Sequence, residues 1–145
     1  MALIEEVRSW LVQEQIGLLS KADLIALVDE KILELNDPPY YLTAISLKES
    51  LAHVPQLDLV KDSVGNKDCA PIARIMLQKL NNGEATLDDI GLYSLRMHQL
   101  LSEEDQLFVD FLWIDDEVNL MSEGVKDKER SERDILETLE KISAL

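Results

Sequence analysis

The chain has few of the residues that disulfides, turns and metal sites require. One cysteine, two histidines, five glycines and four prolines occur among its 145 residues. Cys69 cannot form an internal disulfide, which is typical of a protein from a reducing compartment. Its neighbours Ala70 and Ile72 predict that Cys69 is a small core residue. The scarcity of glycine and proline favours helices over strands.

The motifs that mark common active sites are also missing. The scattered glycines cannot build a phosphate-binding loop, and the hydrolase pattern Gly-x-Ser-x-Gly does not occur. The metal-binding patterns Glu-x-x-His and His-Glu-x-x-His are absent, and His53 and His98 have no ligand-like neighbours. We therefore predict that the protein is not an enzyme and uses no cofactor or metal ion.

Carboxylates could still do acid–base chemistry or hold a hard cation. The densest run is Asp115, Asp116 and Glu117. Adjacent helical residues point about 100° apart, so these three side chains cannot converge on one ion. Glu103, Asp110 and Glu117 share a helix face, but each seven-residue step separates them by about 10 Å. An acidic, solvated surface is the better interpretation.

Nothing in the sequence predicts a membrane protein or an exported one. No stretch approaches the ~20 uncharged apolar residues of a membrane-spanning helix. The first residues, Met1 to Glu6, include two glutamates and lack the basic beginning of a signal peptide. We therefore expect a cytoplasmic protein.

The remaining composition predicts an all-α protein with one domain, residues 1–145. Hydrophobic residues make up 46% and charged residues 30%, which describes a globular chain with a single core. The 3.6-residue period of apolar positions predicts a bundle of six to seven helices. The expected helices span residues 3–16, 21–35, 40–47, 68–80, 87–101, 103–123 and 131–142, with residues 48–66 irregular.

Local signals predict where several of these helices begin. Ser20, Thr86 and Ser102 are expected N-caps, because their hydroxyls can accept a backbone hydrogen bond from the first turn. The pair Pro38-Pro39 separates the second and third helices. Pro71 is compatible with a helix starting at Asp68, because proline is tolerated in the first turn.

Negative charge is the strongest global feature. The chain has 29 acidic and 14 basic residues, a net charge of −15. Such a field repels nucleic acid and anionic membranes and attracts a basic protein partner. Between Leu80 and Val125, 11 acidic residues accompany one basic residue, Arg96, for a net charge of −10.

This local excess favours a functional surface over chance. A surface built only for solubility would intersperse both signs. A region of one sign is commonly used to steer a partner of the opposite sign. The alternative, that acidic proteins acquire acidic patches by chance, stays open.

The predicted helix 103–123 is apolar on two sides. Leu107, Phe111, Ile114 and Val118 form a core stripe by their angular positions. A second stripe is formed by Val109, Trp113 and Leu120. The residues beside this second stripe are Gln106, Asp110, Asp116 and Glu117.

An aromatic residue ringed by acids resembles an interface anchor within a charged rim. We therefore predict a partner-binding surface made of Asp105, Val109, Asp110, Trp113, Asp116, Glu117 and Leu120, together with Asp88 and Asp89. The alternative is that the helix is central and that the last helix covers Trp113. In either case Asp110, Asp116 and Glu117 should be exposed. Tyr40 and Tyr41 have the same two interpretations, partner anchor or core.

The first 50 residues or so resemble a family. The residues concerned are Ser20-Lys21-Ala22-Asp23, then Asp29, then Asp37-Pro38-Pro39-Tyr40-Tyr41-Leu42 leading into Ile45-Ser46-Leu47. This order is similar to the opening of small helical immunity proteins of bacterial polymorphic-toxin and contact-dependent growth inhibition systems. The resemblance implies an acidic, cytoplasmic, non-catalytic toxin inhibitor.

Such proteins cover the active site or substrate-binding face of a toxin C-terminal domain, frequently a basic nuclease. The resemblance thus implies that carboxylates occupy the positions meant for phosphates. Two other functions stay open from the sequence. One is an acidic adaptor or regulatory subunit that docks a different protein, and the other is an enzyme with an unusual carboxylate site.

Overall fold

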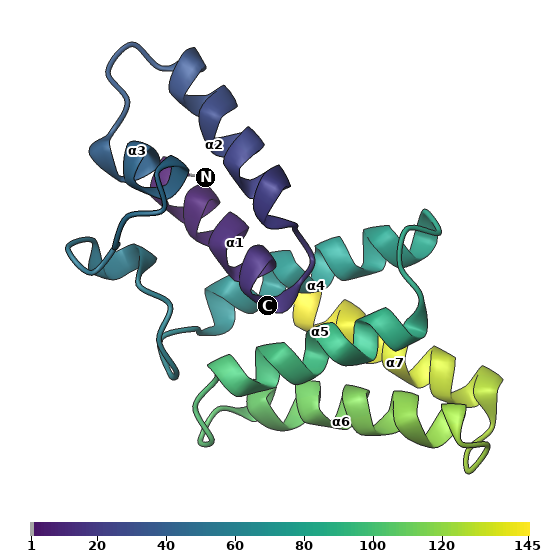
Figure 1. Cartoon of the computed structure of the whole chain (residues 1–145). Helices are drawn as coiled ribbons and strands as arrows, with labels where there is room; N and C mark the ends of the chain where they lie inside the picture. The colour runs from purple at the N-terminus through teal and green to yellow at the C-terminus, as the bar shows by residue number, and fades with distance from the viewer. Residues whose placement is uncertain (1) are drawn as a thin grey trace. The chain divides into compact units, whose positions relative to one another are not determined.

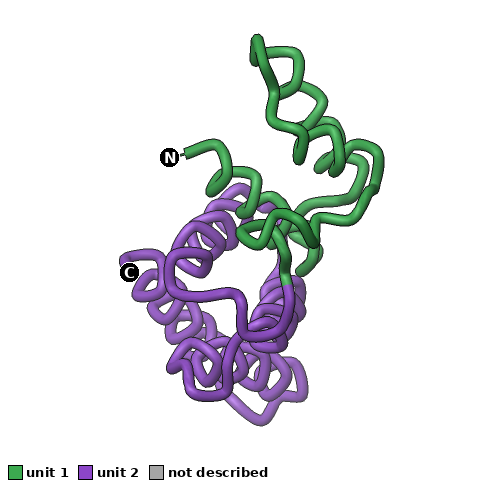
Figure 2. Tube along the Cα trace, turned by 90° about the vertical axis from the view of Figure 1, so that its left-hand side faces the viewer, with its two compact units in different colours: residues 1–59 green, residues 60–145 purple. Residues whose placement is uncertain are grey.

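The computed structural model describes residues 2–145, and all the regular secondary structure in this part of the chain is helical (Figure 1). It contains seven α-helices and one short 3₁₀ helix, η1 (Pro55–Leu57), and no strand occurs within it. The all-α prediction is confirmed. The chain divides into two compact units, residues 1–59 and 60–145, coloured separately in Figure 2. Each unit is described by itself, and the single domain stays a prediction.

Unit 1 contains α1 (Leu3–Ile16), α2 (Lys21–Glu34) and α3 (Tyr40–Ser46). Its helix ends follow local signals. Gly17 has φ +92° after α1, a backbone conformation that glycine adopts without steric cost. Ser20 caps α2 as predicted, because its Oγ accepts a hydrogen bond of 3.0 Å from the Asp23 N–H.

The core of unit 1 forms where these helices meet η1. Its buried side chains are Val7, Leu24, Val28, Leu42, Ile45 and Leu57. Arg8 Nη1 of α1 donates a hydrogen bond of 2.5 Å to the Gln56 carbonyl, which fixes η1 beside α1. Tyr41 is half-buried against this core, whereas Tyr40 is exposed. The structure thus assigns the core position to one tyrosine of the pair.

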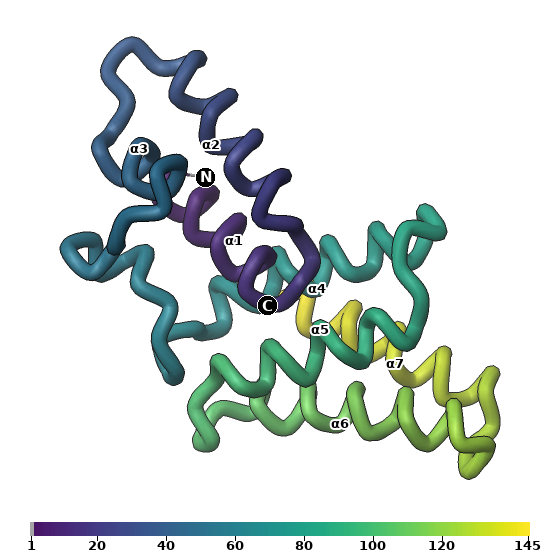
Figure 3. Tube along the Cα trace, in the orientation of Figure 1, coloured from purple at the N-terminus to yellow at the C-terminus, as the bar shows by residue number. Residues whose placement is uncertain are grey.

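Unit 2 contains α4 (Asn66–Asn81), α5 (Leu87–Leu100), α6 (Gln106–Ser122) and α7 (Lys128–Ser143). Helix α6 packs against α5 and α7, and α7 also packs against α4, a path that can be followed in Figure 3. His98 joins α5 to α6, because its Nδ1 lies 3.0 Å from the Phe108 carbonyl and the two rings are in contact. The predicted core stripe of α6 is confirmed, since all four of its residues are buried: Leu107, Phe111, Ile114 and Val118.

The predicted N-cap of α5 is correct, and the predicted N-cap of α6 is wrong. Thr86 caps α5: its Oγ1 accepts from the Asp89 N–H at 3.2 Å, and Asp89 Oδ2 accepts from the Thr86 N–H at 2.9 Å. Ser102 does not cap α6. The cap is Asp105, whose Oδ1 accepts from the Leu107 N–H at 2.9 Å. Both residue types are good caps, so the sequence alone does not choose between them.

Two other helices begin earlier than expected. Helix α4 starts at Asn66, because Asp68 Oδ2 accepts a hydrogen bond of 3.1 Å from the Gly65 N–H. Pro71 is therefore the sixth residue of α4, and the prediction that it lies in the first turn is wrong. Helix α7 starts at Lys128, because Asp127 caps it by accepting from the Arg130 N–H at 3.2 Å.

Helices α5 and α6 approach closely at Gly91. An alanine Cβ there would lie 3.1 Å from both Cβ and Cγ1 of Val118. We expect Gly91→Ala to lower the free energy of unfolding by about 1 kcal/mol, because overpacking costs about 1–3 kcal/mol and the gain in helix propensity returns about 0.5–1 kcal/mol. Valine is stiff about χ1 and cannot rotate away easily. Urea denaturation measures the change.

The close approach of Gly91 to Val118 predicts that a second substitution, at Val118, offsets part of the loss of stability. Val118→Ala should cost less in the Gly91→Ala protein than in the wild type, because it removes the two methyl groups that the new Cβ meets. An increase in stability on Gly91→Ala alone would contradict the packing argument.

Cys69 lies fully buried in α4, as the sequence predicted. Burial raises the pKa of its thiol to about 12, with further contributions from the Asp68 and Asp105 carboxylates. At pH 8 only about one thiol in ten thousand is then ionised. We expect a thiol reagent such as Ellman's reagent to label the native protein far more slowly than the urea-unfolded protein. Equal labelling rates would contradict this.

Candidate protein-binding face

Helix α6 has a second apolar stripe that is only partly covered. Val109 is 53% exposed, whereas Trp113 and Leu120 are half-buried. The stripe therefore reaches solvent at Val109 and is partly packed farther along the helix. Trp113 fits neither a fully buried core position nor a fully exposed anchor, so both interpretations of this residue stay open.

Two of the predicted acids remain accessible beside this stripe. Asp116 is exposed. Asp110 is half-buried, and its Oδ1 accepts a hydrogen bond of 3.2 Å from Gln106 Nε2 one turn earlier. We define the α6 outer face as Val109, Asp110, Trp113, Asp116 and Leu120.

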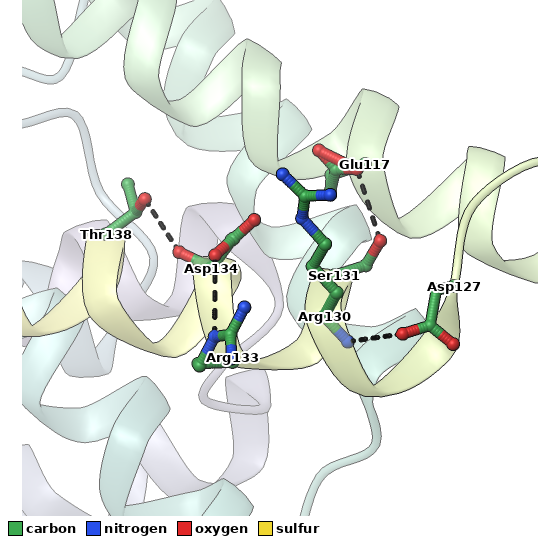
Figure 4. Close-up of polar contacts among 7 residues, drawn as sticks. All are labelled: Glu117, Asp127, Arg130, Ser131, Arg133, Asp134 and Thr138. Carbon is green, nitrogen blue, oxygen red and sulfur yellow. Dashed lines mark hydrogen bonds and ion pairs between the residues drawn. The ribbon is translucent and has the colours of Figure 1, made fainter.

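The prediction that Glu117 is exposed is wrong. Its side chain is 3% exposed, and both carboxylate oxygens are paired. Lys126 Nζ lies 2.8 Å from Oε1 and 3.1 Å from Oε2. Ser131 Oγ donates to Oε1 at 3.3 Å, the contact drawn in Figure 4. Glu117 therefore joins α6 to the start of α7 and cannot face a partner.

The acidic run 115–117 does not form a cation site. Asp115 is half-buried, Asp116 is exposed and Glu117 is buried, so the three side chains diverge as predicted. The pKa of Asp115 is raised by burial and by the Asp116 carboxylate, and His98 partly offsets this. Within residues 2–145 no group of three histidine, cysteine or carboxylate side chains is placed to hold a metal ion.

The other predicted acids lie at the ends of helices. Asp105 and Asp89 act as capping residues, which occupies one carboxylate oxygen of each. Asp88 is exposed and accepts a hydrogen bond of 3.2 Å from Ser122 Oγ at the end of α6. Since α6 is about 25 Å long, Asp105 and Asp88 lie too far apart to belong to one cluster.

Asp88 borders a groove that the sequence did not predict. The groove has a volume of about 390 Å³, and its charged lining is Asp88, Lys128 and Glu132. Leu87 and Met121 supply apolar lining. Residues of α5, α6 and α7 line the groove, so the periodicity of a single helix could not have predicted it.

The chain was compared with protein families, curated proteins and solved structures, and none of them matches it. Within residues 2–145 no helix is both long and apolar enough to cross a membrane. The interpretation of the α6 outer face therefore depends on its geometry and charge.

Proposed function

We propose that the protein is a non-catalytic binding protein that recognises a basic partner through the α6 outer face. The observation that carries this proposal is that exposed Val109 and exposed Asp116 share one face of α6, on a segment, Met97–Val125, without a single lysine or arginine. Exposed apolar area supplies contact, and charge of one sign supplies steering and register.

The kind of partner follows from this chemistry and from the resemblance of the first 50 residues. We propose an immunity protein that neutralises a cognate nuclease-type toxin domain. A nuclease carries basic residues that hold phosphates, and Asp110 and Asp116 offer carboxylates to the same residues. Val109 and the accessible part of Trp113 would fill the space between these charged contacts.

The first step of the test asks whether the gene directly upstream encodes a large secreted protein, and the C-terminal domain of that protein then serves as the partner. Asp110→Lys combined with Asp116→Lys should weaken binding at low salt by about tenfold or more, because two attractive charges become repulsive. Glu137→Lys combined with Glu140→Lys is the matched control, since both residues are exposed on α7 and the net charge changes equally. Glu117 stays unchanged because it is buried.

Each result supports or opposes a particular part of the proposal. Undiminished binding of the Asp110/Asp116 variant at low salt would contradict the α6 outer face. A toxin domain that keeps its nuclease activity in a one-to-one mixture would contradict the immunity role. Failure of the toxin domain to bind, together with binding of another basic protein through α6, would favour an acidic adaptor.

A further inference from the structure

The hairpin of α2 and α3 carries exposed apolar side chains that do not join the core of unit 1. Leu33 is 87% exposed, Leu47 is 64% exposed and Tyr40 is 60% exposed. Within residues 2–59 these are the large hydrophobic side chains that lie open to solvent. Single exposed leucines are common, so their arrangement decides whether they matter.

Leu33 lies near the end of α2, and Tyr40 and Leu47 lie at the two ends of α3. Helices α2 and α3 pack together and are joined by the short segment 35–39, and Ser46 Oγ near the end of α3 donates a hydrogen bond of 2.7 Å to Asp29 Oδ1 of α2. This bond places the end of α3 beside Asp29 of α2. Leu33 lies one turn beyond Asp29, on the side of α2 that borders α3.

Tyr40 is the first residue of α3 and Leu47 follows its last residue, so the two are seven positions apart and lie on the same side of the helix. That face is turned outward, because Leu42 and Ile45 occupy the opposite, core side. We call Leu33, Tyr40 and Leu47 the hairpin patch.

Tyr40 is held in place within the patch. Its hydroxyl donates a hydrogen bond of 2.5 Å to Glu49 Oε2, and its ring lies 6.0 Å from the ring of His53, centroid to centroid. Pro39 fixes the backbone immediately before it. An ordered aromatic side chain loses little conformational freedom on binding, so it suits the role of an anchor.

The charges around the patch indicate the kind of occupant. Asp29 and Glu30 flank Leu33 on α2, and Glu34, Asp37 and Glu49 complete the acidic surroundings. Of the two lysines between residues 29 and 49, Lys31 is half-buried and paired with Glu34 at 3.4 Å, and Lys48 is exposed, so five exposed acidic residues outnumber one accessible lysine. A second copy of the chain would bring the same negative charge to this face, which opposes self-association.

We propose that the hairpin patch is a second docking surface, which takes a basic amphipathic segment of a protein partner. Apolar side chains of that segment would cover Leu33, Tyr40 and Leu47. Its arginines or lysines would face Asp29 and Glu30. The proposal does not depend on the α6 outer face, because its residues belong to unit 1.

The probe is a synthetic amphipathic helix of leucine and arginine, titrated into the whole protein and followed by ¹⁵N NMR. The wild type should show shifts centred on Leu33, Tyr40 and Leu47. Leu33→Ser combined with Leu47→Ser should weaken binding by about tenfold, because it removes exposed contact area without disturbing the core. Val125→Ser, just after α6, is the control, since it removes similar exposed apolar area outside both proposed surfaces and should leave the affinity unchanged.

The dependence on charge is tested with a second peptide in which every arginine is replaced by glutamate. This peptide should not bind. Binding of the glutamate peptide, or equal affinity of the wild type and the Leu33/Leu47 variant, would overturn the proposal. So would a dimer of the wild type, seen by sedimentation, that the Leu33/Leu47 variant abolishes, because the occupant would then be a second copy. The toxin-domain experiment tests the α6 outer face, so its outcome does not decide whether the hairpin patch binds the peptide.

Discussion

Replacing Phe111 with alanine should lower the free energy of unfolding by about 3–5 kcal/mol, as expected for truncating a buried aromatic residue. Phe111 is fully buried on the core side of α6, together with Leu107, Ile114 and Val118. Its removal deletes apolar contact and leaves a cavity that the surrounding helices fill only partly. Since small proteins are stable by about 5–15 kcal/mol, this loss is a large share of the total stability.

Val109→Ser provides the matched control, because Val109 lies two positions earlier on the same helix and is exposed. Its free energy of unfolding should stay within about 0.5 kcal/mol of the wild type. Urea denaturation of both variants measures the difference. A large loss of stability in the Val109 variant would mean that the outer stripe is packed, and it would weaken the proposed docking role of α6.

Removing the partner of a buried charge is the second large effect. Lys126→Met should lower the free energy of unfolding by about 1–3 kcal/mol, because Glu117 keeps only the hydrogen bond from Ser131. The expected loss is smaller than for a fully buried ion pair. The Lys126 side chain is 46% exposed, so water screens part of the interaction.

A double-mutant cycle separates this ion pair from other effects of the substitution. In a Glu117→Gln background, Lys126→Met should cost much less, because no buried carboxylate is left without its cation. The difference between the two backgrounds gives the coupling energy, expected at about 1–3 kcal/mol. Equal costs in both backgrounds would show that Lys126 contributes through packing alone.

The pairing of Glu117 also limits how α6 can be used. Because Lys126 and Ser131 occupy its carboxylate, the accessible charge on α6 is carried by Asp110 and Asp116. Glu117→Lys would therefore disrupt the junction between α6 and α7, and any loss of binding in that variant would report on folding. For this reason the binding test leaves Glu117 unchanged.

Local sequence determined the helices and the core side of α6. Caps such as Ser20 and Thr86 bond to backbone groups three residues away, so their effect is contained in a short stretch of chain. Apolar periodicity likewise predicted the burial of Phe111 and its stripe. The predicted starts of α4, α6 and α7 were wrong by two or three residues, because several suitable capping residues lie close together in the sequence.

Only the tertiary structure decided which polar and aromatic side chains are accessible. The position of α7 buries Glu117, and the packing of α1, α2 and α3 places Tyr41 against the core and leaves Tyr40 exposed. These outcomes depend on residues from other helices. A helical period states which side chains share a face, but what covers that face is set by segments distant in the chain. The negative charge was visible from composition alone, and folding decided which carboxylates a partner can reach.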